Sequence, residues 1–197
     1  MIETFWKWFS DNSEQLTMLD DLDEKTAKRL LVDMQSALDK YCEGLTFEVG
    51  EQTQNGRTLT FSAEGDIDLF KYVTDLVENA PDVDWWEFVA FKQPKGKGLK
   101  VYFDKYVFDT RKMYFTEMEN EESPDMVGLR VAVENPVVGD DDQLVGVYVT
   151  IEGLIGEFDC ATLVGYLEIC PIPQEPFKDG FKIMDDLPDF IEWFKNR

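Results

Sequence analysis

The stretch LTFEVGEQTQNGRTLTFSA, residues 45–63, decides the fold class because its hydrophobic period differs from that of its neighbours. On both sides of Asn55-Gly56, apolar residues alternate with polar ones, as in a strand with one buried face. Asn-Gly is a common hairpin turn signal. The stretch therefore predicts two antiparallel strands, while the residues around Asn-Gly leave the type of loop open.

Three segments with helical periodicity flank this hairpin. Residues 2–9 carry an apolar face and predict a short helix that stops at residues 10–12. Residues 23–42 predict a longer helix, with the side chain of Asp23 capping its start. Residues 66–79 predict a helix in the middle of the chain.

The second half of the chain predicts more strands and a short C-terminal helix. Residues 85–91 carry apolar groups on both faces, which is typical of a central strand covered on two sides. Further strands are predicted at residues 99–103, 112–118, 127–133 and 163–170, and a helix at residues 188–195.

Residues 140–151 carry two opposing signals. The acidic run Asp140-Asp141-Asp142 places negative charge where the positive end of a helix dipole would lie. Residues 145–151 are rich in β-branched side chains, which favour a strand. Both alternatives stay open from the sequence, with the β-branched run weighing against the helix.

Together these elements predict an α+β fold. We expect a largely antiparallel sheet with N-terminal helices, one mid-chain helix and a short C-terminal helix packed on it. We expect a single domain over residues 1–197, because a chain of this length buries a full core. A soft subdivision is expected near residues 117–125, the acidic segment EMENEESPD, which is the most linker-like part of the chain.

The composition excludes several kinds of chemistry. The chain has no histidine, and its 41 acidic residues outnumber its 19 basic residues to give a formal net charge of −22. No Ser-His-Asp or Cys-His pair and no histidine-ligated zinc site can form. The scarcity of Lys and Arg disfavours nucleic acid and anionic membranes as partners. Three cysteines without CxxC spacing and an N-terminus without an apolar leader favour a cytoplasmic protein with reduced thiols.

One segment departs from this acidity. Residues 92–112 hold seven bases and two acids, and Lys95-Gly-Lys97-Gly joins two predicted strands. Backbone amides freed by glycine beside Lys95 and Lys97 would suit a phosphate or carboxylate, although the P-loop pattern is absent. The alternative, which we favour, is a solvated hairpin tip whose lysines protect an edge strand.

Acidic residues are so abundant that some of them cluster by chance. Asp140, Asp141 and Asp142 form the most compact cluster, followed by Glu157 with Asp159 in a turn-like GEFD sequence. Carboxylates of this kind suit Mg²⁺ or carboxylate-based catalysis. No EF-hand loop is present, however, and helix capping or simple solvation is favoured. We therefore expect neither a metal nor a cofactor.

Two tryptophans are candidate binding residues. Trp85 and Trp86 are adjacent on a predicted strand and point to opposite faces, so at most one of them lies in the main core. Trp8 lies off the apolar face of the N-terminal helix. Exposed Trp is enriched at binding hot spots, which singles out Trp8 and Trp85, although core packing is the commoner role of Trp.

Four short sequences also suggest a relationship to other proteins. They are FWKWF at residues 5–9, LTFSAEGD at residues 59–66, the spaced pattern F..V..LV..AP….W..VAFK at residues 70–92, and GEFD at residues 156–159. Together they resemble a pattern in bacterial conserved proteins of unassigned function. The resemblance implies a small bacterial cytosolic α+β protein and carries over no functional residue.

Two functions follow as hypotheses. The first is a non-enzymatic interaction protein that binds a basic partner through an acidic and aromatic surface. The alternative is a carboxylate- or Mg-dependent enzyme acting on a small anionic or sugar substrate near Lys95 and Lys97. The first is favoured, because the chain lacks a side chain that ordinarily titrates near neutral pH. Binding of a small ligand without chemistry is a third hypothesis, and the oligomeric state is left open.

Overall fold

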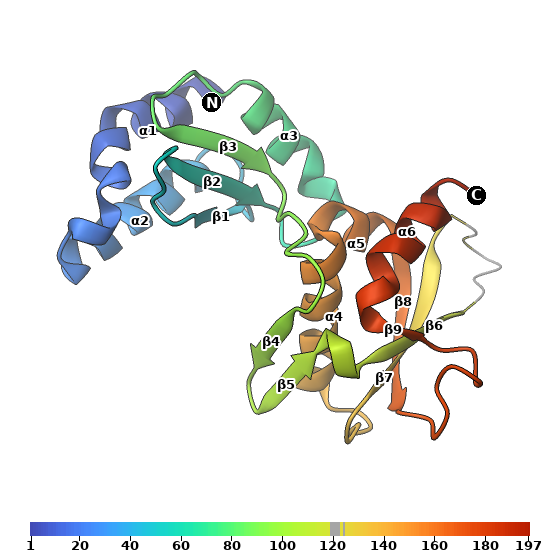
Figure 1. Cartoon of the computed structure of the whole chain (residues 1–197). Coiled ribbons are helices and arrows are strands. Elements are labelled where there is room, and N and C mark those ends of the chain that lie inside the picture. The colour runs from blue at the N-terminus through green and yellow to red at the C-terminus, as the bar shows by residue number, and fades with distance from the viewer. Residues whose placement is uncertain (119–122, 124) are drawn as a thin grey trace. The chain divides into compact units, whose positions relative to one another are not determined.

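The computed structural model describes residues 1–118, 123 and 125–197, which form two compact units, Met1–Lys92 and Gln93–Arg197 (Figure 1). The single domain over residues 1–197 stays a prediction. The expected subdivision at residues 117–125 falls within the second unit, and residues 119–122 and 124 of it lie outside the described residues. Within the described ranges, every helix is too short or too polar to cross a membrane.

The first unit begins with two helices, α1 (Ile2–Thr17) and α2 (Glu24–Asp39), which contact each other. The predicted cap of α2 is confirmed, since the Asp23 carboxylate accepts a hydrogen bond from the Thr26 amide at 3.1 Å. A third helix, α3 (Phe70–Glu78), lies at the predicted mid-chain position after a 3₁₀ turn at Ile67–Leu69.

The predicted end of the first helix is wrong. Helix α1 continues through residues 10–12 to Thr17. The side chains of Ser10 and Asn12 donate hydrogen bonds to carbonyls four residues earlier in the helix, so they do not compete with it. Leu16 is fully buried seven residues after Phe9 and continues the apolar face. Burial along these added turns outweighs the weak helix propensity of the polar residues.

The hairpin is confirmed. Strands β1 (Thr46–Val49) and β2 (Arg57–Ser62) pair antiparallel, with Thr46 opposite Ser62. Strand β3 (Trp86–Ala90) runs parallel to β2 and is at the edge of the sheet order β1-β2-β3, so the prediction of a central strand is wrong. Its apolar residues are explained by α1, because the rings of Trp86 and Phe88 pack on Phe9.

The core of the first unit is aromatic. The ring of Trp6 packs edge-on against Phe9, Phe61 and Phe88, with centroids 5.8, 5.8 and 4.6 Å away. Its indole N–H donates to the carbonyl of Leu76 at 3.0 Å, which ties α1 to α3. Edge-to-face pairs contribute about 0.5–1.5 kcal/mol each beyond simple burial. These contacts fix the position of α1 on the sheet.

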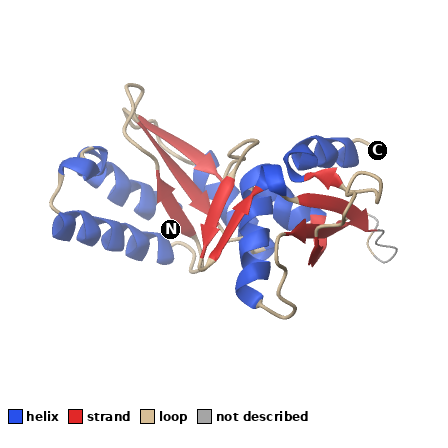
Figure 2. Cartoon of the chain, turned by 60° about the horizontal axis from the view of Figure 1, so that its bottom comes forward, coloured by secondary structure: helices blue, strands red, loops and turns tan. Residues whose placement is uncertain are grey.

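The second unit contains helices and strands as the first does (Figure 2). Strands β4 (Lys100–Phe103) and β5 (Tyr106–Asp109) form a hairpin. A four-stranded sheet has the order β8-β7-β6-β9, in which only β7 and β8 are parallel. Its strands are β6 (Tyr114–Met118), β7 (Val127–Val133), β8 (Val164–Pro171) and β9 (Lys182–Ile183).

The conflict at residues 140–151 is resolved in favour of a helix, α4 (Asp141–Ile155), so the strand alternative is wrong. Val147, Ile151 and Leu154 are buried at helical spacing, and this burial outweighs the strand propensity of the β-branched residues. The predicted turn at GEFD is also a helix, α5 (Glu157–Leu163), which follows Gly156 directly.

The C-terminal helix, α6 (Leu187–Lys195), confirms the last predicted element. It packs on the sheet as expected, since the ring of Phe190 lies 5.5 Å from that of Phe115 on β6. Leu129 and Val131 on β7 are fully buried in the same core. The α+β fold is thus confirmed, with mostly antiparallel strands distributed over three sheets in the described residues.

Candidate functional site

The first unit carries a groove beside α1. Its volume is about 630 Å³, and its walls are the later turns of α1 and the loop before β3. Hydroxyl, carboxylate and apolar side chains line it. The lining residues are Ser10, Ser13, Glu14, Thr17, Met18, Asp82, Val83, Asp84 and Trp85.

Trp85 is held at the groove in an unusual backbone conformation. Its φ is 70°, and 61% of its surface is exposed. The Trp85 carbonyl accepts a hydrogen bond from the Arg57 amide at 2.8 Å, at the start of the β2/β3 pairing. A Cβ atom at Gly56 would lie 2.2 Å from the same carbonyl oxygen, so only glycine fits there. Positive φ at a non-glycine residue costs about 1–3 kcal/mol and is typical of functional positions.

The charge of the groove is uniformly negative. Glu14, Asp82 and Asp84 are exposed, and within the described ranges none of them has a Lys or Arg partner within ion-pairing distance. Met18, 46% exposed, adds an apolar contact beside them. The groove therefore offers an aromatic ring, a thioether and three uncompensated carboxylates to whatever binds there.

The other predicted tryptophan, Trp8, is half-buried and does not line this groove. Trp86 faces inward as the alternation along a strand predicts. Its ring packs 5.1 Å from Phe9, and its indole N–H donates to the Thr17 hydroxyl at 3.0 Å. Of the two candidates, only Trp85 is presented to solvent beside acidic groups.

The structure does not bring Lys95 and Lys97 to one site. The side chain of Lys97 forms ion pairs with Asp189 at 2.7 Å and Asp186 at 3.8 Å, and the hydrogen bond to Asp189 raises the pKa of Lys97. Lys95 is exposed, and its backbone amide donates to the Gly153 carbonyl at 2.7 Å. The Gly98 amide donates to Asp185 at 2.9 Å, so acids already engage the Lys97 ammonium and the Gly98 amide, two of the groups that were expected to hold an anion.

Asp140, the first residue of the acidic run 140–142, caps the start of α4. Asp140 accepts hydrogen bonds from the Gln143 amide and, at 2.7 Å, from the Tyr106 hydroxyl. It also pairs with Lys105 at 3.0 Å, and these donors, Tyr106 foremost, lower the pKa of Asp140 to about 2. In the part of the chain that the structure describes, no group of three or more acidic or thiol side chains is placed to hold a metal ion.

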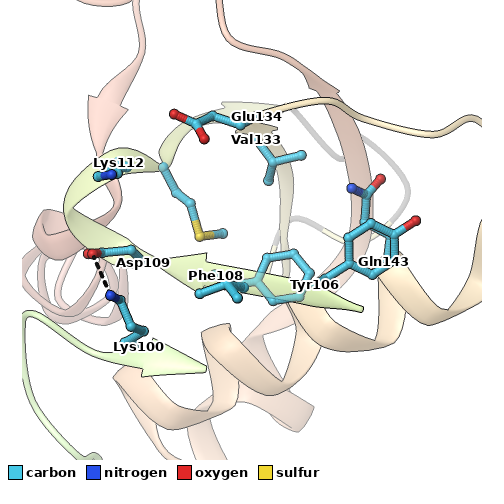
Figure 3. A pocket seen from close by; sticks show the side chains of 10 residues that line it. Lys100, Tyr106, Phe108, Asp109, Lys112, Val133, Glu134 and Gln143 are labelled. Carbon is cyan, nitrogen blue, oxygen red and sulfur yellow. Dashed lines mark ion pairs between the residues drawn. The ribbon is translucent and has the colours of Figure 1, made fainter. Parts of the chain in front are cut away.

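A small pocket in the second unit was missed by the sequence analysis. It has a volume of about 180 Å³ (Figure 3). It lies between β5, the C-terminal end of β7 and the first turn of α4. Phe108, Met113 and Val133 form its apolar part, and Lys100 and Lys112 lie at its basic side. The basic composition of residues 92–112 was a signal for it, although the sequence singled out Lys95 and Lys97, which do not line this pocket.

Of the two acids that line this pocket, Asp109 is already neutralised. The Arg111 guanidinium donates two hydrogen bonds of 2.9 Å to the two carboxylate oxygens of Asp109 and thereby lowers the pKa of Asp109 to about 2. Lys100 is only a distant partner, with 3.9 Å between its ammonium nitrogen and Asp109. No acid of the described residues lies within ion-pairing distance of Lys112.

The three cysteines are free, and none is activated. Burial raises the pKa of Cys160 to about 12 and also raises the pKa values of Cys42 and Cys170, which are half-buried. All three therefore carry a proton at neutral pH, and a thiol is a far weaker nucleophile than a thiolate.

Comparison with protein families, with curated proteins and with solved structures finds no match for this chain. The resemblance to bacterial conserved proteins stays a prediction.

Proposed function

We propose that the protein is a non-enzymatic interaction protein whose groove beside Trp85 binds a basic segment of a partner protein. One observation carries this proposal: an exposed Trp is held at positive φ beside three carboxylates that lack basic partners among the described residues. Glycine would adopt that conformation without strain. A strained Trp that packs little of its ring into the core is explained by a role in binding.

The chemistry of the groove suits arginine and lysine side chains. An aromatic face attracts a cation, and carboxylates add opposite charge that speeds association and selects the partner. Nucleic acid is disfavoured at the same surface, because phosphates would meet carboxylates. Three free thiols fit a reducing compartment, so the proposal includes a cytoplasmic location. The enzyme alternative has less support, because Asp140 already accepts from three donors.

Affinity capture with variants of the exposed tryptophans tests this proposal. The wild type is expected to retain a basic protein at low ionic strength and to release it at high ionic strength. Trp85→Ala is expected to weaken this binding by about 30-fold or more, which corresponds to the ~2 kcal/mol of a hot spot. Trp193→Ala is the matched control, because Trp193 is also exposed, at 56%, but lies in the second unit.

A second variant separates lost binding from lost folding. Trp85→Gly removes the ring and the backbone strain together, so we expect it to keep the fold and still lose the partner. The proposal would be overturned if both Trp85 variants retained the partner as the wild type does. An acidic partner, or equal losses with Trp193→Ala, would also contradict it.

A further inference from the structure

The pocket of the second unit provides a further inference, which is independent of the proposed function. We propose that it binds a small monocarboxylate, with the carboxylate at Lys100 and Lys112 and a short apolar chain against Phe108, Met113 and Val133. The size of the pocket, its charge and the division of its lining into a basic and an apolar side all favour such a ligand.

The volume limits the ligand. A space of about 180 Å³ equals that of about six water molecules and is below the usual range for drug-sized ligands. A monocarboxylate with a few carbon atoms fits this space. The apolar side chains at its base are almost fully buried, since Phe108, Met113 and Val133 are each 3% exposed, so the base is a fixed part of the core.

The charge selects an anion. Asp109 has both carboxylate oxygens engaged by Arg111, so it competes little for the two lysines at the pocket. Lys112 has no acidic partner in the described ranges, and Lys100 has only the long contact of 3.9 Å. Glu134 also lines the pocket but is exposed, so solvent screens its repulsion. A bound carboxylate supplies the counter-charge that Lys112 lacks and adds to the distant one that Lys100 has in Asp109.

The other polar side chains that line the pocket already have hydrogen-bond partners within the protein, so they do not favour a more polar ligand. The Tyr106 hydroxyl donates to Asp140, and the Gln143 side chain is bonded to the backbone of Asn135 and Val137. Inorganic phosphate would therefore find two cations but few free donors, and it would leave the apolar side unfilled. This division favours a carboxylate with a hydrocarbon chain over a compact anion.

Titration calorimetry and NMR with butyrate test the inference. We expect saturable binding of butyrate, weaker binding of acetate and phosphate, and no comparable binding of butanol, which lacks the charge. Lys112→Gln and Lys100→Gln are each expected to weaken butyrate binding by about tenfold, the effect of losing one charge-assisted hydrogen bond. Lys95→Gln is the matched control, since this exposed lysine of the same segment does not line the pocket.

Several results would overturn the inference. Absence of saturable butyrate binding to the wild type would do so directly. Equal losses with Lys95→Gln would show general attraction to the basic segment rather than a site. Phosphate binding as strongly as butyrate would show that the apolar side contributes nothing.

Discussion

Replacing Gly56 with alanine is expected to lower the free energy of unfolding by about 2–5 kcal/mol, the sum of backbone strain and steric overlap. Gly56 has a φ of 107°, and a Cβ atom there would lie 2.2 Å from the carbonyl oxygen and 2.6 Å from the carbonyl carbon of Trp85. Backbone cannot move aside as a flexible side chain can. The overlap would separate β2 from β3 at the point where their pairing begins.

Chemical denaturation of Gly56→Ala measures this loss, and Gly96→Ala is its matched control. Gly96 also has a positive φ, 89°, but a Cβ atom there would meet nothing within 4 Å. We expect the control to lose only about 1 kcal/mol, the cost of strain alone. The unfolding transition of the first unit is compared between Gly56→Ala and the wild type. The transition of the second unit is compared between Gly96→Ala and the wild type. Equal losses in the two variants would contradict the close approach of Gly56 and Trp85.

Replacing Arg57 with methionine is expected to lower the free energy of unfolding by about 2–4 kcal/mol, because two backbone carbonyls lose the buried, charged guanidinium that donates to them. Arg57 is 3% exposed, and its guanidinium donates to the carbonyls of Thr17 and Gly50, each at 2.9 Å. It also pairs with Asp20, which is largely exposed and so adds less. Methionine keeps most of the volume but leaves both carbonyls without their partner.

Arg130→Met is the control for this prediction. Arg130 pairs with Glu168 at 3.2 Å, and both side chains are exposed. Pairs of this kind contribute about 0–1 kcal/mol. Urea denaturation measures the free energy of unfolding of both variants and so distinguishes the buried arginine from the exposed one. A loss for Arg57→Met no larger than that for Arg130→Met would show that the guanidinium does not hold the end of α1 to the β1–β2 loop.

Local sequence patterns predicted most helices and strands. They failed where burial in the tertiary structure decides whether a segment is a helix or where it ends. The capped helix α2, the β1–β2 hairpin and the C-terminal helix follow from periodicity alone. The true end of α1 depends on the burial of Leu16, which no local pattern reveals. Helix α4 is decided in the same way, because its β-branched residues are buried in the core of the second unit.

The candidate sites show the same division. Alternation along a strand predicted that Trp85 and Trp86 point apart, but no local pattern reveals the positive φ of Trp85 or its close approach to Gly56, which is distant in sequence. The basic segment was evident, and within it only the glycine-flanked Lys95 and Lys97 were singled out. In the structure, Asp189 pairs with Lys97, while Lys112 stays without an acidic partner among the described residues. Neither the Asp189–Lys97 pair nor the lack of an acidic partner for Lys112 among the described residues can be derived from spacing along the chain.

The proposed function requires that the surface beside Trp85 recognises basic side chains. An NMR titration with an arginine-rich peptide tests it most directly, because each tryptophan indole N–H gives its own signal. We predict that the Trp85 indole and the amides of Glu14 and Asp84 shift together and saturably, while the Trp193 indole does not. Shifts spread over acidic residues elsewhere, with the Trp85 signal unchanged, would contradict the claim.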